Sequence, residues 1–156
     1  MIKEIKGDLV EMQDIGIFCH QTNCFKTMGA GIAKRICQKY PEVRYKDYDY
    51  QTKYGSKQIF GTINCVKCHD GRICVNFYSQ YAYGRDKRYT DYDMFQKCLD
   101  RLAKGLRSIP NDVKIGFPKN IGCGLAGGNW NKVLAMIEDF ATKIDQDVYI
   151  VEFSTI

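Results

Sequence analysis

Two glycine-rich segments are the part of this sequence best suited to hold a phosphate group. Residues 122–128 read Gly-Cys-Gly-Leu-Ala-Gly-Gly, so they contain the pattern G-x-G-x-x-G just before a predicted helix. Residues 28–31 read Met-Gly-Ala-Gly and also precede a predicted helix. Glycine lets backbone N–H groups approach a phosphate closely, and a helix N-terminus adds about half a positive charge. Together the two segments predict a diphosphate gripped from both sides.

Two other functions of glycine-rich segments fit this chain poorly. A dinucleotide-binding oxidoreductase needs its fingerprint directly after a strand in the first of two βαβ halves, but residues 118–121 intervene and only one helix and one strand follow. No Gly-Lys-Ser/Thr follows residue 31, which excludes a P-loop. A flexible loop at 122–128 and an ordinary helix start at 28–31 remain open alternatives.

His20 and Asn23 are the candidate residues for chemistry near the first glycine segment. A histidine titrates near neutral pH, so His20 can act as general acid or base or as a nucleophile. The amide of Asn23 offers both a donor and an acceptor to vicinal sugar hydroxyls. A structural role for His20 remains open. The only other histidine, His69, lies at a predicted hairpin tip and is set aside.

The eight cysteines are expected to be reduced thiols rather than a disulfide framework. Residues 65–69 match C-x-x-C-H, the pattern of covalent haem attachment. No export signal precedes it, and Cys65 and Cys68 on one strand would point to opposite faces of the sheet. We therefore expect neither a haem nor a metal ion.

Aromatic residues gather in two stretches, 45–54 and 78–92. Tyrosines interspersed with basic residues can form a stacking surface for nucleic acid. For the first stretch, packing against the protein is the favoured interpretation. The basic aromatic loop at residues 81–89 fits a lid over an anionic ligand and a solvated loop equally well.

The hydrophobic period alternates between that of strands and that of helices along the chain. Strands are expected at 2–6, 15–19, 59–66, 72–78, 113–117 and 148–153, and helices at 32–40, 42–54, from a capping box at Thr90 and Asp93, and from Asn129. The Asp70-Gly71 pair predicts a tight hairpin. Such alternation predicts a mixed α/β sheet covered on both faces, with ligands in the loops at the carboxyl ends of the strands.

Length and composition favour one ordinary globular domain over residues 1–156. The chain is 45% apolar and 26% charged, with a formal net charge of +5. No apolar run is long enough to cross a bilayer and no signal-peptide pattern is present, so we expect a cytoplasmic protein without membrane contact. No basic arm suggests sequence-specific nucleic-acid binding.

In combination, these motifs resemble the macro domain family. The resemblance runs in order along nearly the whole chain and rests on residues 6–9 (KGDL), 20–24 (HQTNC), 28–34 (MGAGIAK), 39–41 (KYP) and 121–125 (IGCGL). It is greatest to the branch named ADP-ribose-1''-phosphate phosphatase, related to the terminal ADP-ribose glycohydrolases. The family implies a three-layer α/β/α fold with a mixed, mostly parallel sheet and ADP-ribose as ligand.

The resemblance also implies roles for individual residues. His20 and Asn23 would be catalytic in removing the 1''-phosphate, which leaves ADP-ribose, and no cofactor is implied. The ligand-binding residues implied are Asp8, Leu9, Asn23, Gly29, Ala30, Gly31, Ile32, Ser79, Gln80, Gly122, Cys123, Gly124, Leu125, Ala126, Gly127 and Phe153. Among them, Asp8 would accept from the adenine amino group and Phe153 would stack on the ring.

Four positions depart from the family's hydrolytic branches. Gln80 stands where the glycohydrolases use lysine, and Ala126 and Ala33 stand where hydrolases use aspartate. Asn129 stands where relatives of the phosphatase type often carry aspartate. Three hypotheses stay open: a phosphatase, a non-catalytic reader of ADP-ribosylated macromolecules, and a hydrolase using His20 or a carboxylate from the 86–91 region.

Overall fold

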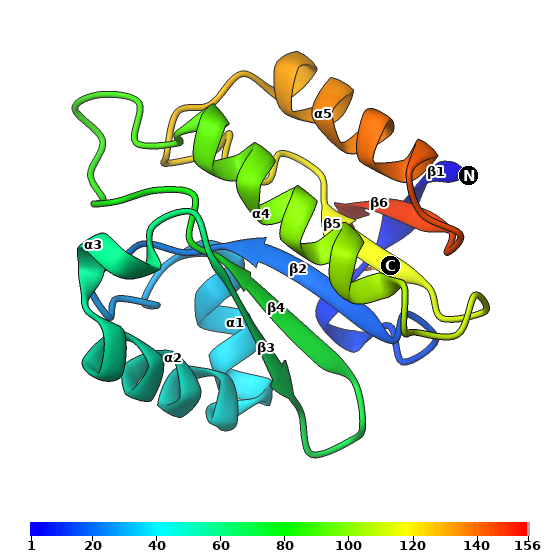
Figure 1. The fold of residues 1–156 in the computed structure, drawn as a ribbon, viewed down its shortest axis with the longest axis horizontal. Coiled ribbons are helices and arrows are strands. Elements are labelled where there is room, and N and C mark those ends of the chain that lie inside the picture. Colours follow the sequence, from blue (N-terminus) through cyan, green and yellow to red (C-terminus); the bar gives the residue numbers. More distant parts are fainter. Residues whose placement is uncertain (156) are drawn as a thin grey trace.

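The computed structural model contains one six-stranded sheet with helices on both of its faces (Figure 1). The structure describes residues 1–155. In chain order the elements are β1 (Ile2–Gly7), the 3-10 helix η1 (Leu9–Glu11), β2 (Ile17–Gln21), α1 (Gly31–Lys39), α2 (Pro41–Tyr54), α3 (Ser56–Ile59), β3 (Ile63–Lys67), β4 (Ile73–Phe77), α4 (Tyr92–Leu106), β5 (Ile115–Pro118), α5 (Trp130–Thr142) and β6 (Val148–Phe153).

The strand order across the sheet is β1-β6-β5-β2-β4-β3. All neighbouring pairs are parallel except β3 and β4, which run antiparallel. The expected mixed, mostly parallel sheet is therefore confirmed. Because five strands point the same way, their carboxyl ends meet at one edge of the sheet, where ligands bind in such folds.

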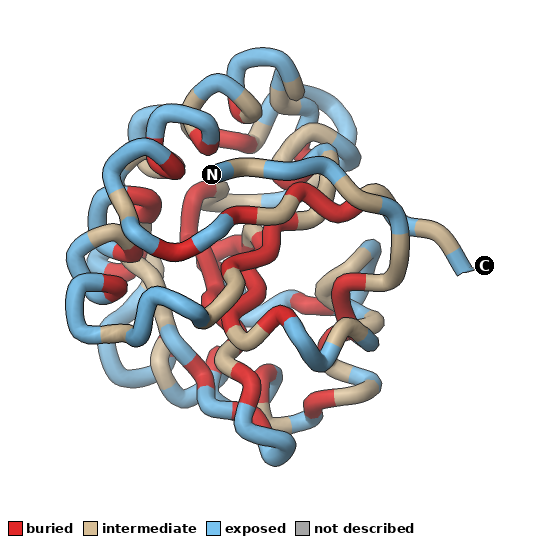
Figure 2. Tube along the Cα trace, turned by 90° about the vertical axis from the view of Figure 1, so that its right-hand side faces the viewer, coloured by how far each residue is buried: buried red, intermediate tan, exposed pale blue. Residues whose placement is uncertain are grey.

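Side-chain alternation along the strands divides the core into two layers. On β2, Ile17 and Cys19 pack with residues of α4 and α5, whereas Phe18 packs with residues of α1 and α2. Figure 1 shows these helix pairs on opposite sides of the sheet, and Figure 2 shows the buried chain segments running between exposed outer ones. The three-layer α/β/α architecture is confirmed.

The predicted hairpin is present, although residues 68–72 rather than a two-residue turn separate its strands, and two predicted helix boundaries agree with the structure. Gly71 adopts a φ of +92° between β3 and β4, and Gly55 ends α2 with a φ of +80°. Both angles lie in the left-handed region that favours glycine. Asn129 is the N-cap of α5, since its side chain accepts a hydrogen bond from the Lys132 N–H.

Several boundaries differ from the sequence-based expectation; β2, for example, runs over Ile17–Gln21 rather than residues 15–19. The segment before β3 is helical over α3, and β3 starts only at Ile63. The fifth strand begins at Ile115 rather than residue 113. Thr90 does not cap α4: Asp91 does so by accepting from the Met94 N–H, because the Thr90 hydroxyl bonds elsewhere.

The tyrosines of α2 are mostly exposed, so their expected packing role is wrong for most of them. Tyr45, Tyr48 and Tyr54 are 68%, 56% and 40% exposed. Tyr50 alone among the four packs inward, stacking on Tyr78 and sharing a 2.6 Å hydrogen bond with Thr62.

All eight thiols are free. Cys65 on β3 is exposed, whereas Cys68, expected on the same strand, lies one residue beyond its end and is buried. No helix of the described chain combines the length and apolar character that crossing a bilayer requires.

Candidate functional site

A cavity of about 810 Å³ opens at the carboxyl edge of the sheet. Its walls come from the segments that follow β1, β2, β4 and β5, from the last residues of β6 and from the start of α1. The sequence-predicted site residues that line it are Leu9, Asn23, Gly29, Ala30, Gly31, Ile32, Gln80, Gly122, Gly124, Leu125, Ala126 and Phe153. The topology therefore brings segments more than a hundred residues apart to one cavity.

The two glycine segments form facing parts of this cavity. Gly29 and Gly124 line it, and a Cβ atom added to either would meet no atom within 4 Å. Gly31 and Gly122 have φ angles of +56° and +71°, which L-residues with side chains rarely adopt. Glycine is therefore favoured at Gly31 and Gly122 by the backbone conformation, whereas the space beside Gly29 and Gly124 is open to a ligand.

The start of α1 presents backbone donors to the cavity. Ala30 is the N-cap and makes no side-chain capping bond, while Gly31, Ile32 and Ala33 all line the cavity. The first N–H groups of a helix have no partner within the helix. Uncapped donors in the first turn of α1 are therefore suited to bind an anion.

A polar network lies beside the second glycine segment. The Gln21 amide nitrogen donates to Gln80 Oε1 at 3.0 Å and to Thr90 Oγ1 at 2.9 Å, and its oxygen accepts from Ser79 Oγ at 2.5 Å. Thr90 Oγ1 donates in turn to the Gly122 carbonyl at 2.5 Å. Ser79 is fully buried and does not line the cavity, so its contribution is to hold Gln21.

The 81–90 segment is tied to the glycine segment by its backbone. The carbonyl of Ala126 accepts from the N–H groups of both Tyr89 and Thr90, at 2.8 and 3.2 Å. A Cβ atom on Gly127 would lie 3.3 Å from the Arg88 Cα, so Gly127 supports this contact instead of lining the cavity. Tyr83 and Arg85 from the same segment do line the cavity.

The charged lining of the cavity is cationic. Arg35, Arg85 and Lys119 line it, whereas the described lining contains no Asp, Glu, His or Cys side chain. Lys119 pairs with Glu4 at 2.7 Å, while Arg85 forms no ion pair with any residue in 1–155. A desolvated anion would be stabilised here, but general acid–base catalysis by a lining carboxylate or imidazole is not available.

Hydrogen bonds from α2 fix the position of the loop that contains Asn23. The Asn23 amide donates to the Thr27 carbonyl and accepts from the Phe25 N–H, each at 2.9 Å. Gln51 donates to the Asn23 carbonyl at 3.2 Å and to Asp47 Oδ1 at 3.0 Å. Burial raises the pKa of Asp47 above its usual range. Sequence reasoning missed Asp47 and Gln51, whose role depends on partners distant in the chain.

No protein-family model matches the chain. Among curated proteins, it is 26% identical over 149 residues to an "Uncharacterized 17.5 kDa protein in tk-vs intergenic region" of Enterobacteria phage T4, covering 93% of each. It is also 23% identical to an "ADP-ribose 1''-phosphate phosphatase" of Saccharomyces cerevisiae, covering 95% of this chain and 97% of that protein.

Solved structures decide the fold. The macrodomain of Mycobacterium tuberculosis DarG superimposes with a TM-score of 0.83 at 21% identity, covering 97% of both chains. The chain has the macrodomain fold. A structure titled "Thermosipho africanus DarTG in complex with ADP-ribose" also matches, with a TM-score of 0.79 at 20% identity; this macrodomain covers 41% of that chain.

His20 lies inside the macrodomain and away from the cavity, contrary to its expected catalytic contact. It is fully buried and does not line the cavity. It lies one residue before the end of β2 and on the same face as Phe18, where Asn76 of β4 is its cross-strand neighbour. The two side chains share a 2.6 Å hydrogen bond through His20 Nε2. An imidazole in this position cannot touch a ligand in the cavity.

Burial lowers the pKa of His20 from 6.5 to about 4, despite the hydrogen bond to Asn76. Between these values the unfolded chain binds a proton that the folded macrodomain does not, so stability falls as the pH falls. A shift of this size corresponds to about 3 kcal/mol of unfolding free energy lost between pH 7 and pH 4. Urea unfolding across that range measures the slope, and His20→Gln should flatten it. An unchanged slope would contradict this role of His20.

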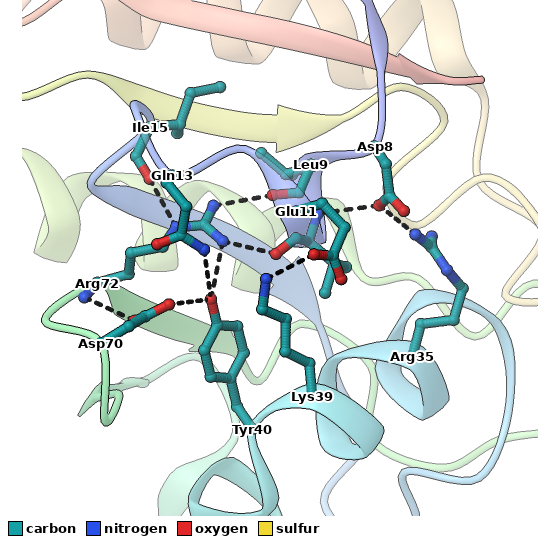
Figure 3. Close-up of polar contacts among 11 residues, drawn as sticks. Asp8, Leu9, Glu11, Gln13, Ile15, Arg35, Lys39, Tyr40, Asp70 and Arg72 are labelled. Atoms are coloured by element: carbon teal, nitrogen blue, oxygen red, sulfur yellow. Dashed lines mark hydrogen bonds and ion pairs between the residues drawn. The ribbon is translucent and has the colours of Figure 1, made fainter. Parts of the chain in front are cut away.

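Besides His20 and Ser79, three other predicted site residues of the macrodomain do not line the cavity. Asp8 caps η1 by accepting from the Val10 N–H at 3.1 Å and also pairs with Arg35 (Figure 3). Cys123 and Gly127 lie behind the lining. Asp86 and Asp91 also lie off the lining; Asp86 accepts from the Tyr89 hydroxyl and Asp91 caps α4.

Arg72 fixes the segment that carries Asp8 and Leu9, and sequence reasoning missed it. This side chain is only 3% exposed. It donates to the carbonyls of Leu9, Val10 and Ile15 at 2.8, 2.7 and 2.9 Å (Figure 3). Its guanidinium also lies 4.3 Å from the centroid of the Phe18 ring. One buried arginine, directly before β4, thus holds the η1 side of the cavity.

Proposed function

We propose that this macrodomain binds ADP-ribose. The observation that carries the proposal is the meeting of the two glycine segments at one cavity, whose charged lining is cationic. The diphosphate would lie between the first turn of α1 and residues 122–126, where backbone N–H groups and Arg85 are available. Similarity to the DarTG structure in complex with ADP-ribose supports this ligand.

The two ends of the cavity suit the two ends of that ligand. Asn23 and Gln80 lie on the side of β2 and β4, where their amides can meet the hydroxyls of the distal ribose. Leu9 and Phe153 lie on the side of β1 and β6, where they offer an apolar surface to adenine. The volume of about 810 Å³ is in the range of small-molecule sites.

A second candidate function is hydrolysis of ADP-ribose 1''-phosphate to ADP-ribose and inorganic phosphate. The name of the Saccharomyces cerevisiae relative favours it. The lining carries no carboxylate, imidazole or thiol within residues 1–155, and His20 is enclosed. We therefore place binding first, which also fits a reader of ADP-ribosylated macromolecules.

Calorimetric titration with ADP-ribose and with its 1''-phosphate, followed by an assay for inorganic phosphate, tests both candidates. We expect micromolar binding of ADP-ribose at one site and no phosphate release above the uncatalysed rate. Absence of binding would contradict the proposal. Release of phosphate would establish the second function, and an undiminished rate in His20→Gln would show that His20 takes no part in it.

A further inference from the structure

Three side chains from three elements meet at the β6 end of the cavity. Asp8 follows β1, Arg35 lies on α1, and Phe153 ends β6. The Arg35 guanidinium lies 4.1 Å from the centroid of the Phe153 ring and also pairs with the Asp8 carboxylate. Arg35 and Phe153 both line the cavity, so this stack forms part of its wall.

The Asp8 carboxylate keeps one oxygen for another donor. Both of its hydrogen bonds with described residues, from the Val10 N–H and from Arg35, use Oδ1. The cap of η1 and the pair with Arg35 hold the carboxylate through Oδ1, and Oδ2 makes no hydrogen bond with a residue in 1–155. A ligand amino group could therefore bond to Oδ2 of Asp8 without displacing the Val10 N–H from Oδ1.

A phenyl ring and a guanidinium can both stack on a flat base, but Arg35 and Phe153 lie too close together to admit one between them. A ring inserted between two planes needs about 7 Å, since each contact takes about 3.5 Å. The guanidinium must therefore move outward by about 3 Å from its present 4.1 Å. Arg35 is long and its side chain is 32% exposed, so rotation of its outer bonds can supply that movement.

We propose that Arg35 is a specificity-determining residue that closes over a purine base lying on Phe153. The inference rests on the proposed function and names the group that grips the base of the ligand. Phenyl ring, base and guanidinium would form a three-layer stack, anchored at its edge by Asp8. A guanidinium is planar and stacks on aromatic faces, which an ammonium cannot do.

Calorimetry with ADP-ribose, AMP and ribose 5-phosphate tests this stack. We expect Arg35→Ala to weaken both adenine ligands about 10-fold, in line with the stacking contribution of a single base. Arg35→Lys should lose nearly as much affinity, because lysine keeps the positive charge but lacks the planar guanidinium. Lys34→Ala, the control, removes an exposed positive charge from the same helix and should change affinity less than twofold. Ribose 5-phosphate should be unaffected by Arg35→Ala.

Unchanged or tighter binding of AMP by Arg35→Ala would overturn the inference, because Arg35 would then only cover Phe153. Thermal unfolding of each variant shows whether it folds. If Arg35→Ala does not fold, the AMP affinity of Arg35→Lys tests the inference instead. If wild type binds AMP in an Arg35-dependent way but not ADP-ribose, the proposed function fails and the stack stands. If ADP-ribose binds and Arg35→Ala has no effect, the stack fails and the function stands.

Discussion

Gly124→Glu is expected to abolish measurable ADP-ribose binding while leaving the fold intact. Gly124 lines the cavity, and a Cβ atom there would meet no atom within 4 Å. The new carboxylate would project beside the site proposed for the diphosphate, where it would add like charge in a desolvated position. We expect a loss of about 100-fold or more, since an unfavourable charge contact of this kind costs several kcal/mol.

Gly105→Glu is the matched control for that experiment. Gly105 lies exposed on α4, and a Cβ atom there also meets nothing within 4 Å. Gly105→Glu adds the same charge outside the cavity and should leave the affinity for ADP-ribose unchanged within about twofold. Equal binding by Gly124→Glu and wild type would show that the second glycine segment does not face the ligand.

Arg72→Met is expected to cost about 3–5 kcal/mol of unfolding free energy, the usual effect of breaking a buried charged network. The substitution leaves the carbonyls of Leu9, Val10 and Ile15 buried without their donors. For a domain of this length that loss lowers Tm by roughly 10 °C. Differential scanning calorimetry measures it directly.

Arg72→Lys should recover little of this stability. One ammonium cannot reproduce the fork with which Arg72 reaches three carbonyls and the Tyr40 hydroxyl. Arg101→Met, which removes an exposed arginine from α4, is the control and should change Tm by no more than about 2 °C. A similar loss of stability in both variants would contradict the special role of Arg72.

Sequence reasoning predicted those parts of the site whose signal is local. Glycine at positions 31 and 122 is required by the backbone conformation of the residue itself, and the strand-to-helix order already implied that such turns share one sheet edge. The same order predicted a mixed α/β sheet, and the resemblance of the motifs to the macro domain family implied the particular fold. Asn129 was predicted as a cap because capping depends on residues three positions apart.

The features of the structure that sequence reasoning did not predict all depend on distant partners. His20 follows an apolar run at a strand end, but its environment is set by Asn76, 56 residues later. Arg72 reaches carbonyls about sixty residues earlier in the chain, and Arg35 meets Phe153 only because α1 and β6 converge. No spacing pattern in one sequence carries that information.

The shared Ala126 carbonyl has a consequence for how relatives of this chain can diverge. The N–H groups of Tyr89 and Thr90 both donate to it, so this one carbonyl oxygen joins residues 81–90 to the second glycine segment. A change in length within that stretch would therefore displace the second glycine segment even where its own residues are unchanged. An insertion or deletion in this outer loop would thus change the affinity for the diphosphate, although the loop residue that changed does not contact it.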